Sequence, residues 1–189
     1  MRLLSLFGIA LTFLAGCETA VSPPGNSGPA PDAIPARASA TNLSPEQVNL
    51  TTGDEKTLAT LLEAHQGEVV FVDYWATWCH PCVEYFPHTV EMHGRFKDQG
   101  LAVIAVSFDE VDDEPKVREY LAQQGADFEH VLSKYGIGTE ANEAFDLDQV
   151  PHFRLYDRSG KLVRKWDDKP TDADEKIEEL LKAGSGKNE

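Results

Sequence analysis

Runs of apolar residues alternate with amphipathic stretches along most of the chain. Two of these runs, residues 69–75 (VVFVDYW) and 101–108 (LAVIAVSF), contain one charged side chain between them, that of Asp73. Continuous apolar runs of this length are typical of strands that are buried on both faces of a sheet. We therefore expect two central strands here.

The segments around these runs predict helices and a hairpin. Capping-box spacing from Thr52 to Glu55 precedes leucines at helical spacing, residues 79–99 read as a long helix interrupted at Pro87, and Pro115 favours a helix start. Further helices are expected near 140–145 and from about 172 to 184, and an antiparallel hairpin is expected over 152–157 and 162–166. Strands that alternate with helices predict an α/β fold, and the hairpin makes its sheet mixed.

The first 16 residues have the layout of a secretory signal. Arg2 precedes an apolar run that is too short to span a bilayer. The run ends in Leu14-Ala15-Gly16-Cys17, which resembles the lipobox of bacterial lipoproteins. This resemblance implies that the signal 1–16 is removed and that Cys17 carries lipid. A plain signal peptide that contains a cysteine is the alternative.

The domain boundaries follow from composition. Residues 17–49 combine the lipidated cysteine with a Pro-, Ala- and Ser-rich stretch that lacks a periodic apolar face, so we expect a flexible tether. Residues 50–183 form the expected folded domain and 184–189 a disordered tail. The resulting expectation is an extracytoplasmic, membrane-anchored lipoprotein on the periplasmic face of the inner or outer membrane.

Charge excludes some functions. The 189 residues include 17 basic and 32 acidic side chains, which gives a formal net charge of −15. This balance argues against binding to nucleic acid, which needs a basic surface, and against electrostatic attachment to an anionic bilayer. Three cysteines are too few for a disulfide-dense scaffold.

The segment Cys79-His80-Pro81-Cys82 lies between an expected strand and an expected helix, where Cys-x-x-Cys predicts a redox-active pair. A helix N-terminus stabilises a thiolate at Cys79, and Cys82 lies about one turn further on. Half of a zinc site is the alternative, but no other cysteine remains in the domain to complete it. We expect no metal and no cofactor.

Residues 72–82 (VDYWATWCHPC), followed by Val150-Pro151, resemble the thioredoxin superfamily. The resemblance implies a three-layer α/β fold with a central mixed β-sheet, helices on both faces and a cis peptide bond before Pro151. The long segment 108–148, Pro87 and the lipoprotein start are similar to the TlpA/ResA-like branch of extracytoplasmic thiol-disulfide oxidoreductases.

This resemblance also implies roles for individual residues. Cys79 and Cys82 would be catalytic, and Asp73 would be a buried acid that exchanges a proton with Cys82; burial would raise its pKa. The expected substrate groove is lined by Val150, Pro151 and His152. Trp78, His80 and Pro81 would tune the pair. A cationic His80 would stabilise the Cys79 thiolate and raise the reduction potential, unless His80 simply faces solvent.

The same resemblance implies the activity, a protein-disulfide oxidoreductase that works by mixed-disulfide exchange on exported protein thiols and disulfides. Apocytochrome c is a candidate substrate, a membrane thiol reductase is the implied electron donor, and reduction is favoured over oxidation. The alternative is a copper carrier that uses Cys79, Cys82 and His152, although copper carriers on this fold space their cysteines by three residues.

Three further interpretations concern residues near this site. The acidic run 109–114 is read as a solvated loop, since a calcium loop would need a glycine and a spacing that are missing. Trp75 is expected to be half core and half rim. His130 is expected at the surface or at the edge of the core.

Overall fold

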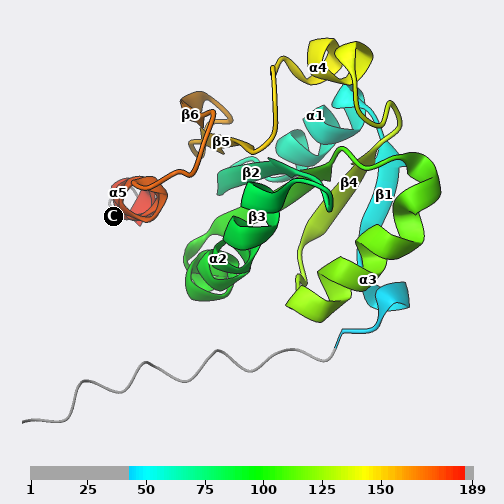
Figure 1. Ribbon diagram of the computed structural model, residues 1–189. Coiled ribbons are helices and arrows are strands. Elements are labelled where there is room, and N and C mark those ends of the chain that lie inside the picture. The colour runs from blue at the N-terminus through cyan, green and yellow to red at the C-terminus, as the bar shows by residue number, and fades with distance from the viewer. Residues whose placement is uncertain (1–42, 186–189) are drawn as a thin grey trace, which may run out of the picture. The chain divides into compact units, whose positions relative to one another are not determined.

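The computed structural model describes residues 43–185, which contain one six-stranded sheet and its covering helices (Figure 1). The elements in chain order are η1 (Pro45–Gln47), β1 (Leu50–Gly53), α1 (Glu55–Ala64), β2 (Val69–Trp75), α2 (His80–Phe96), η2 (Lys97–Gln99), β3 (Leu101–Ser107), η3 (Val111–Asp113), α3 (Glu114–Gln124), β4 (Glu129–Ser133), α4 (Thr139–Phe145), β5 (His152–Tyr156), β6 (Leu162–Trp166) and α5 (Ala173–Ser185). None of the helices described is long and apolar enough to cross a membrane. The signal sequence, Cys17, most of the tether and the last four residues lie outside the described residues.

The strands are ordered β1-β4-β3-β2-β5-β6. The first four run parallel to one another, whereas β5 pairs antiparallel with β2 and β6 pairs antiparallel with β5. The mixed sheet and its closing hairpin are therefore confirmed. The sequence analysis did not predict β1 or β4, which pair with each other at the edge of the sheet.

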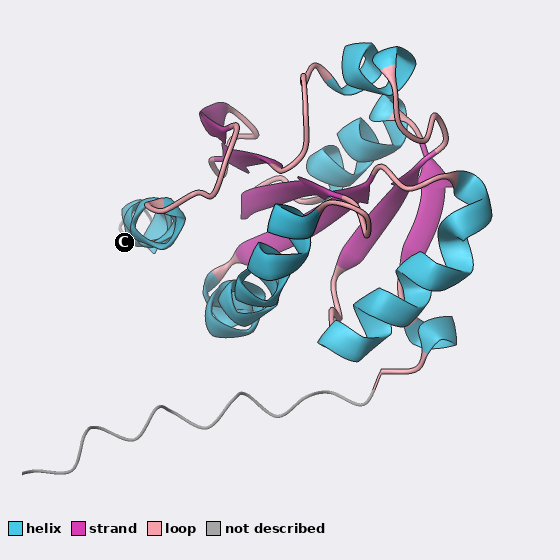
Figure 2. Ribbon diagram, viewed as in Figure 1, coloured by secondary structure: helices cyan, strands magenta, loops and turns pink. Residues whose placement is uncertain are grey.

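Helices cover both faces of the sheet, as expected (Figure 2). On one face α2 packs against α3, where Phe86 and Tyr120 are in ring contact, and ion pairs from His88 and Arg95 to Asp174 join α2 to α5. On the other face lie α1 and α4. Because both faces are covered, every residue of β2 and β3 is buried.

The expected interruption of the long helix at Pro87 is wrong, because α2 runs through this proline without a break. A proline inside a helix has no N–H for the carbonyl four residues earlier, here that of Val83. The hydroxyl of Tyr120 on α3 donates to this carbonyl oxygen at 3.4 Å. The neighbouring helix thus satisfies the group that Pro87 leaves free.

The cap of α1 also differs from the prediction. Asp54, rather than Thr52, is the N-cap residue, and its carboxylate accepts hydrogen bonds from the backbone N–H groups of Lys56 and Thr57. Thr52 cannot take this role because it belongs to β1, where it lies opposite Leu132 of β4.

Two side chains placed at the edge of the core are buried within it. Trp75 packs against both Phe86 and Tyr120, with its ring tilted to each of theirs. His130 packs on Phe128, and burial lowers its pKa to about 4. Both residues lie on strands of the parallel part of the sheet, which leaves little room for a solvent-facing side chain.

Candidate functional site

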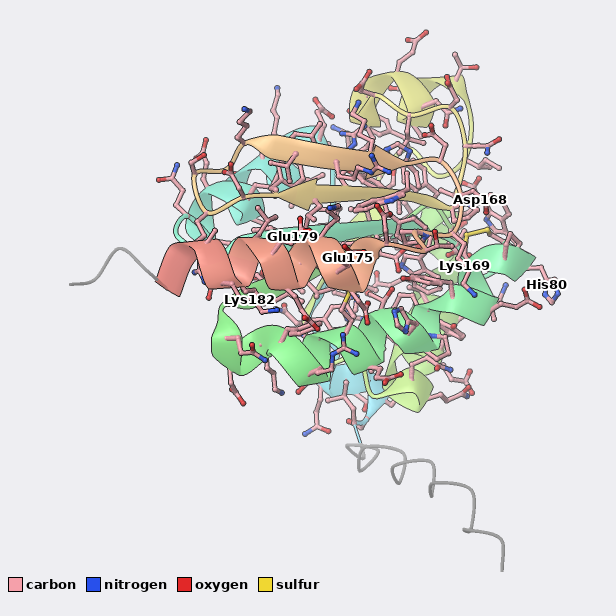
Figure 3. All side chains as sticks on the ribbon, turned by 90° about the vertical axis from the view of Figure 1, so that its left-hand side faces the viewer. His80, Asp168, Lys169, Glu175, Glu179 and Lys182 are labelled. Atoms are coloured by element: carbon pink, nitrogen blue, oxygen red, sulfur yellow. A yellow bond between two sulfur atoms is a disulfide. The ribbon has the colours of Figure 1, made fainter. Side chains whose placement is uncertain are left out.

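A disulfide joins Cys79 to Cys82 where β2 passes into α2 (Figure 3). The two Cα atoms are 5.3 Å apart, and both side chains are buried. Cys79 is the N-cap residue of α2, and its Sγ accepts a hydrogen bond from the Cys82 N–H at 3.3 Å. Pro81 lies in the first turn of the helix, where a missing N–H costs nothing. The predicted strand, Cys-x-x-Cys and helix order is confirmed.

The Val150–Pro151 peptide bond is cis, as expected. Pro151 immediately precedes β5, whose first residue, His152, lies opposite Tyr74 of β2. Tyr74 is close to the C-terminal end of β2, which leads into Cys79. The proline and the disulfide therefore lie at the same end of these two paired strands. Contact of Val150, Pro151 and His152 with a substrate stays a prediction.

Asp73 lies beneath α2 and is only 2% exposed. In residues 43–185 it has a single hydrogen-bond donor, the hydroxyl of Thr89 on α2, at 2.7 Å from Oδ2. Burial raises the pKa of Asp73 to about 7, and the Thr89 hydrogen bond opposes this rise. The pKa values of Tyr85 and Tyr120 are raised by burial and, to a smaller extent, by the charge of Asp73. The expected rise in the Asp73 pKa is thus found.

His152 is turned into the fold. Its Nε2 accepts a hydrogen bond from Arg154 Nε at 3.1 Å, so the ring proton is on Nδ1, which donates to Asp167 Oδ1 at 2.8 Å. Burial and the charge of Arg154 lower the His152 pKa. Both ring nitrogens are therefore engaged within the protein. The part of the chain described contains no group of three His, Cys, Asp or Glu side chains arranged to hold a metal ion.

The side chains assigned to tuning are exposed to different extents. His80 is 84% exposed, and Figure 3 shows it pointing away from the start of α2. Its Nε2 lies 3.2 Å from Glu84 Oε1 one turn further on. Trp78 is 49% exposed beside the disulfide-bearing turn. Tyr85, three residues after Cys82, is buried against Phe153.

Asp109 was missed by the sequence analysis. The solvated-loop interpretation of 109–114 is wrong for this residue, which has 0% exposure. Its carboxylate accepts hydrogen bonds from the N–H and hydroxyl of Thr77, two residues before Cys79, and from the hydroxyl of Ser107. Its position directly after β3 could have revealed it. Parallel neighbours β2 and β3 end at the same end of the sheet, so a residue that follows β3 lies near the segment that leads to Cys79.

A mixed sheet covered on both faces, with a Cys-x-x-Cys disulfide at the N-terminus of a central helix, defines a thioredoxin-like protein. More specifically, the chain belongs to the AhpC/TSA family, whose model matches residues 44–167.

Several similar proteins are named as thiol-disulfide oxidoreductases. The thiol-disulfide oxidoreductase ResA of Bacillus thuringiensis subsp. konkukian is 30% identical over 121 residues, which cover 64% of this chain and 66% of ResA. ResA of Bacillus subtilis is 30% identical over 99 residues, which cover 52% of each chain. The match therefore spans between about half and just under two thirds of these relatives.

Solved structures agree on the fold. A thiol:disulfide interchange protein DsbE from Chlorobium tepidum superposes with a TM-score of 0.53 at 30% identity, covering 66% of this chain and 85% of the other. The thioredoxin domain of a thiol-disulfide oxidoreductase from Bacteroides vulgatus gives a TM-score of 0.54 at 25% identity, covering 64% and 84%.

Proposed function

We propose that this protein is a thiol-disulfide oxidoreductase that acts by mixed-disulfide exchange. The observation that carries the proposal is the Cys79–Cys82 disulfide at the N-terminus of α2, the helix whose Thr89 hydrogen-bonds a buried carboxyl group, Asp73, with a pKa of about 7. Similarity to ResA and to DsbE supports the same activity.

In the reducing direction, the thiolate of Cys79 attacks one sulfur of a substrate disulfide. The other substrate sulfur leaves as a thiolate and takes up a proton, and a mixed disulfide remains on Cys79. Cys82 then loses its proton and attacks Cys79 Sγ, which releases the second substrate sulfur and closes the Cys79–Cys82 bond. Two electrons pass from the protein to the substrate.

Asp73 serves as the proton acceptor for Cys82 in this second step and returns the proton in the reverse reaction. A group that exchanges protons works best when its pKa lies near the working pH. The pKa of about 7 meets this requirement, and the hydrogen bond from Thr89 to Asp73 supports it, because Thr89 and Cys82 belong to the same helix.

We place the protein outside the cytoplasm, tethered to a membrane through lipid on Cys17, with the reducing direction favoured. Its substrates are exported protein thiols and disulfides, with the haem-site cysteines of apocytochrome c as candidates and a membrane thiol reductase as electron donor. The lipobox-like segment and the similarity to ResA support this placement. Mass spectrometry of membrane fractions tests it, because an unmodified Cys17 would remove the anchor.

Reduction of insulin disulfides, driven by dithiothreitol, tests the activity. We expect Cys79→Ser to abolish turnover. Cys82→Ser, first reduced and then freed of dithiothreitol, should instead accumulate a mixed disulfide with insulin through Cys79, because resolution needs the second thiol. Non-reducing electrophoresis detects the trapped species, and added reductant releases it. Full turnover by Cys79→Ser would contradict the proposal.

A further inference from the structure

The chain between β2 and α2 forms a tight turn over residues 76–79. The N–H of Cys79 donates to the carbonyl oxygen of Ala76 at 3.2 Å, so Thr77 and Trp78 occupy the centre of the turn. This turn delivers Cys79 to the N-cap position of α2, where Sγ lies 3.3 Å from the N–H of Cys82. The shape of the turn therefore decides how Sγ faces the helix N-terminus.

Asp109 holds the centre of this turn. The N–H of Thr77 lies 2.9 Å from Oδ2 and 3.2 Å from Oδ1 of Asp109, and the Thr77 hydroxyl also donates to Oδ1. A backbone N–H cannot be redirected without moving the chain, so this contact restrains the backbone two residues before Cys79.

Hydrogen bonds with the end of β3 hold Asp109 in place. The hydroxyl of Ser107, the last residue of β3, donates to Oδ2 at 2.6 Å and accepts from the Asp109 N–H at 3.1 Å. The N–H of Phe108 donates to the Trp75 carbonyl oxygen at 2.9 Å, which joins the ends of β3 and β2 at the same level. The turn is thus anchored to the core through Asp109.

We propose that Asp109 is a positioning residue for Cys79, which keeps the turn 76–79 in the shape that presents Cys79 Sγ to the N-terminus of α2 in the oxidised and the reduced protein. It acts through Thr77 and touches neither the disulfide nor a substrate. The inference deepens the proposed function and rests on it for the reaction that the positioning serves.

Two properties of Asp109 are separable, its negative charge and its acceptor oxygens. Asp109→Ala removes both. Asp109→Asn removes the charge but keeps an oxygen at the Oδ2 position for the Thr77 N–H and the Ser107 hydroxyl, while its amide N–H₂ can face the Thr77 hydroxyl, which rotates to accept. Displacement of Cys79 Sγ and loss of the Asp109 charge have opposite effects on the ionisation of the Cys79 thiol. Loss of position withdraws the helix N–H from the thiolate and disfavours ionisation, whereas loss of a nearby negative charge favours it.

The test uses the reduced protein and three measurements. These are the rate of reaction with a small aromatic disulfide, the pH at which the Cys79 thiol ionises by ultraviolet absorbance, and the equilibrium with glutathione. In that equilibrium, the protein disulfide and two glutathione molecules give the protein dithiol and one glutathione disulfide. Asp112→Ala, which removes an exposed acid three residues further on, is the matched control for charge.

We expect Asp109→Ala to react about 10- to 100-fold more slowly, the range associated with misplacement of a reacting group. Its Cys79 thiol should ionise at higher pH, and the glutathione equilibrium should shift toward the disulfide. Asp109→Asn should stay within about 3-fold of the wild-type rate, and Asp112→Ala should match the wild type, because neither change withdraws the acceptor from Thr77. Thermal unfolding establishes that each variant is folded at the assay temperature.

Several outcomes would overturn the inference. One is a wild-type rate and ionisation for folded Asp109→Ala. Another is an equal effect of Asp109→Asn and Asp109→Ala with ionisation at lower pH, which would assign the role to charge. If Asp109→Ala does not fold, Ser107→Ala takes its place, because it removes a hydrogen bond from the same carboxylate. It must shift the ionisation of Cys79 and the glutathione equilibrium in the same directions by smaller amounts. No shift in Ser107→Ala would overturn the inference. Wild-type protein that fails to reduce insulin while the variants still follow the expected pattern would refute the proposed function alone.

Discussion

Two buried aspartates lie near the disulfide, and their surroundings differ. Asp73 is in β2 and is 2% exposed, whereas Asp109 follows β3 and has 0% exposure. Within residues 43–185, Asp73 receives one hydrogen bond, from Thr89. Asp109 receives hydrogen bonds from three groups, two on Thr77 and one on Ser107. Equal burial therefore comes with unequal numbers of donors.

The difference indicates what each carboxyl group can do. A buried carboxylate with one donor is poorly compensated for the water it has lost, so burial raises the pKa of Asp73 to about 7 and both protonation states are accessible. The oxygens of Asp109 are occupied by donors that belong to the turn and to the sheet, so this group suits a structural tie. The number of donors supports the two proposed roles, proton exchange for Asp73 and restraint of the backbone for Asp109.

The largest expected effect is on stability, from Asp73→Asn. The pKa of Asp73 is raised from 3.8 to about 7 by folding, so the folded protein keeps a proton that the unfolded chain loses, and stability falls as the pH rises through this window. Asparagine does not ionise. Above pH 7 the variant should be more stable than the wild type by up to about 4 kcal/mol, with no such gain below the unfolded pKa.

Denaturant unfolding of the oxidised protein at the two ends of this pH window checks the expectation. Asp109→Asn is the matched control, because it makes the same chemical change at the other buried aspartate. Its free energy of unfolding should fall by about 1 kcal/mol, since the Thr77 hydroxyl loses the carboxylate oxygen to which it donates. If both variants gain stability equally above pH 7, the distinction between the two aspartates is wrong.

A smaller effect is expected from Thr89→Val, which removes the single donor to Asp73 and keeps the side-chain shape. The hydrogen bond favours the charged form, so its loss should raise the pKa of Asp73 further, by somewhat less than one unit for a bond worth about 1 kcal/mol. The pH dependence of mixed-disulfide resolution should move upward accordingly. Thr89→Ser keeps the hydroxyl and should leave the profile in place, and an unchanged profile in the valine variant would contradict the expectation.

The smallest effect is expected from His80→Gly, outside both buried sites. A protonated His80 would stabilise the Cys79 thiolate and raise the reduction potential, so its removal should lower the potential. Its exposure of 84% and the carboxylate of Glu84 at 3.2 Å reduce this influence, and we expect a shift on the order of 10 mV. Equilibration with glutathione measures it. Glu84→Gln, which removes the opposing charge, should shift the potential upward, and an unchanged potential in both variants would leave His80 without a tuning role.

Local sequence patterns predicted much of the fold and site. The apolar runs of β2 and β3, the hairpin of β5 and β6 and the Cys-x-x-Cys segment each carry their signal within a few residues. The strands β1 and β4 carried no comparable signal. They are short, and β1 alternates so little that only its pairing with β4 makes it a strand.

The sequence by itself determined the position of the redox pair and of an acid in the strand before it, since the spacing of Cys79 and Cys82 and the lone charge of Asp73 in an apolar strand are local properties. Only the tertiary structure decided that Asp109 is buried against the turn that leads to Cys79. The residues that follow it in sequence are mostly acidic and exposed, and its partner Thr77 is 32 residues away. Parallel pairing of β2 and β3 brings the two together and removes water from the carboxylate, and burial next to a distant donor leaves no trace in a local pattern.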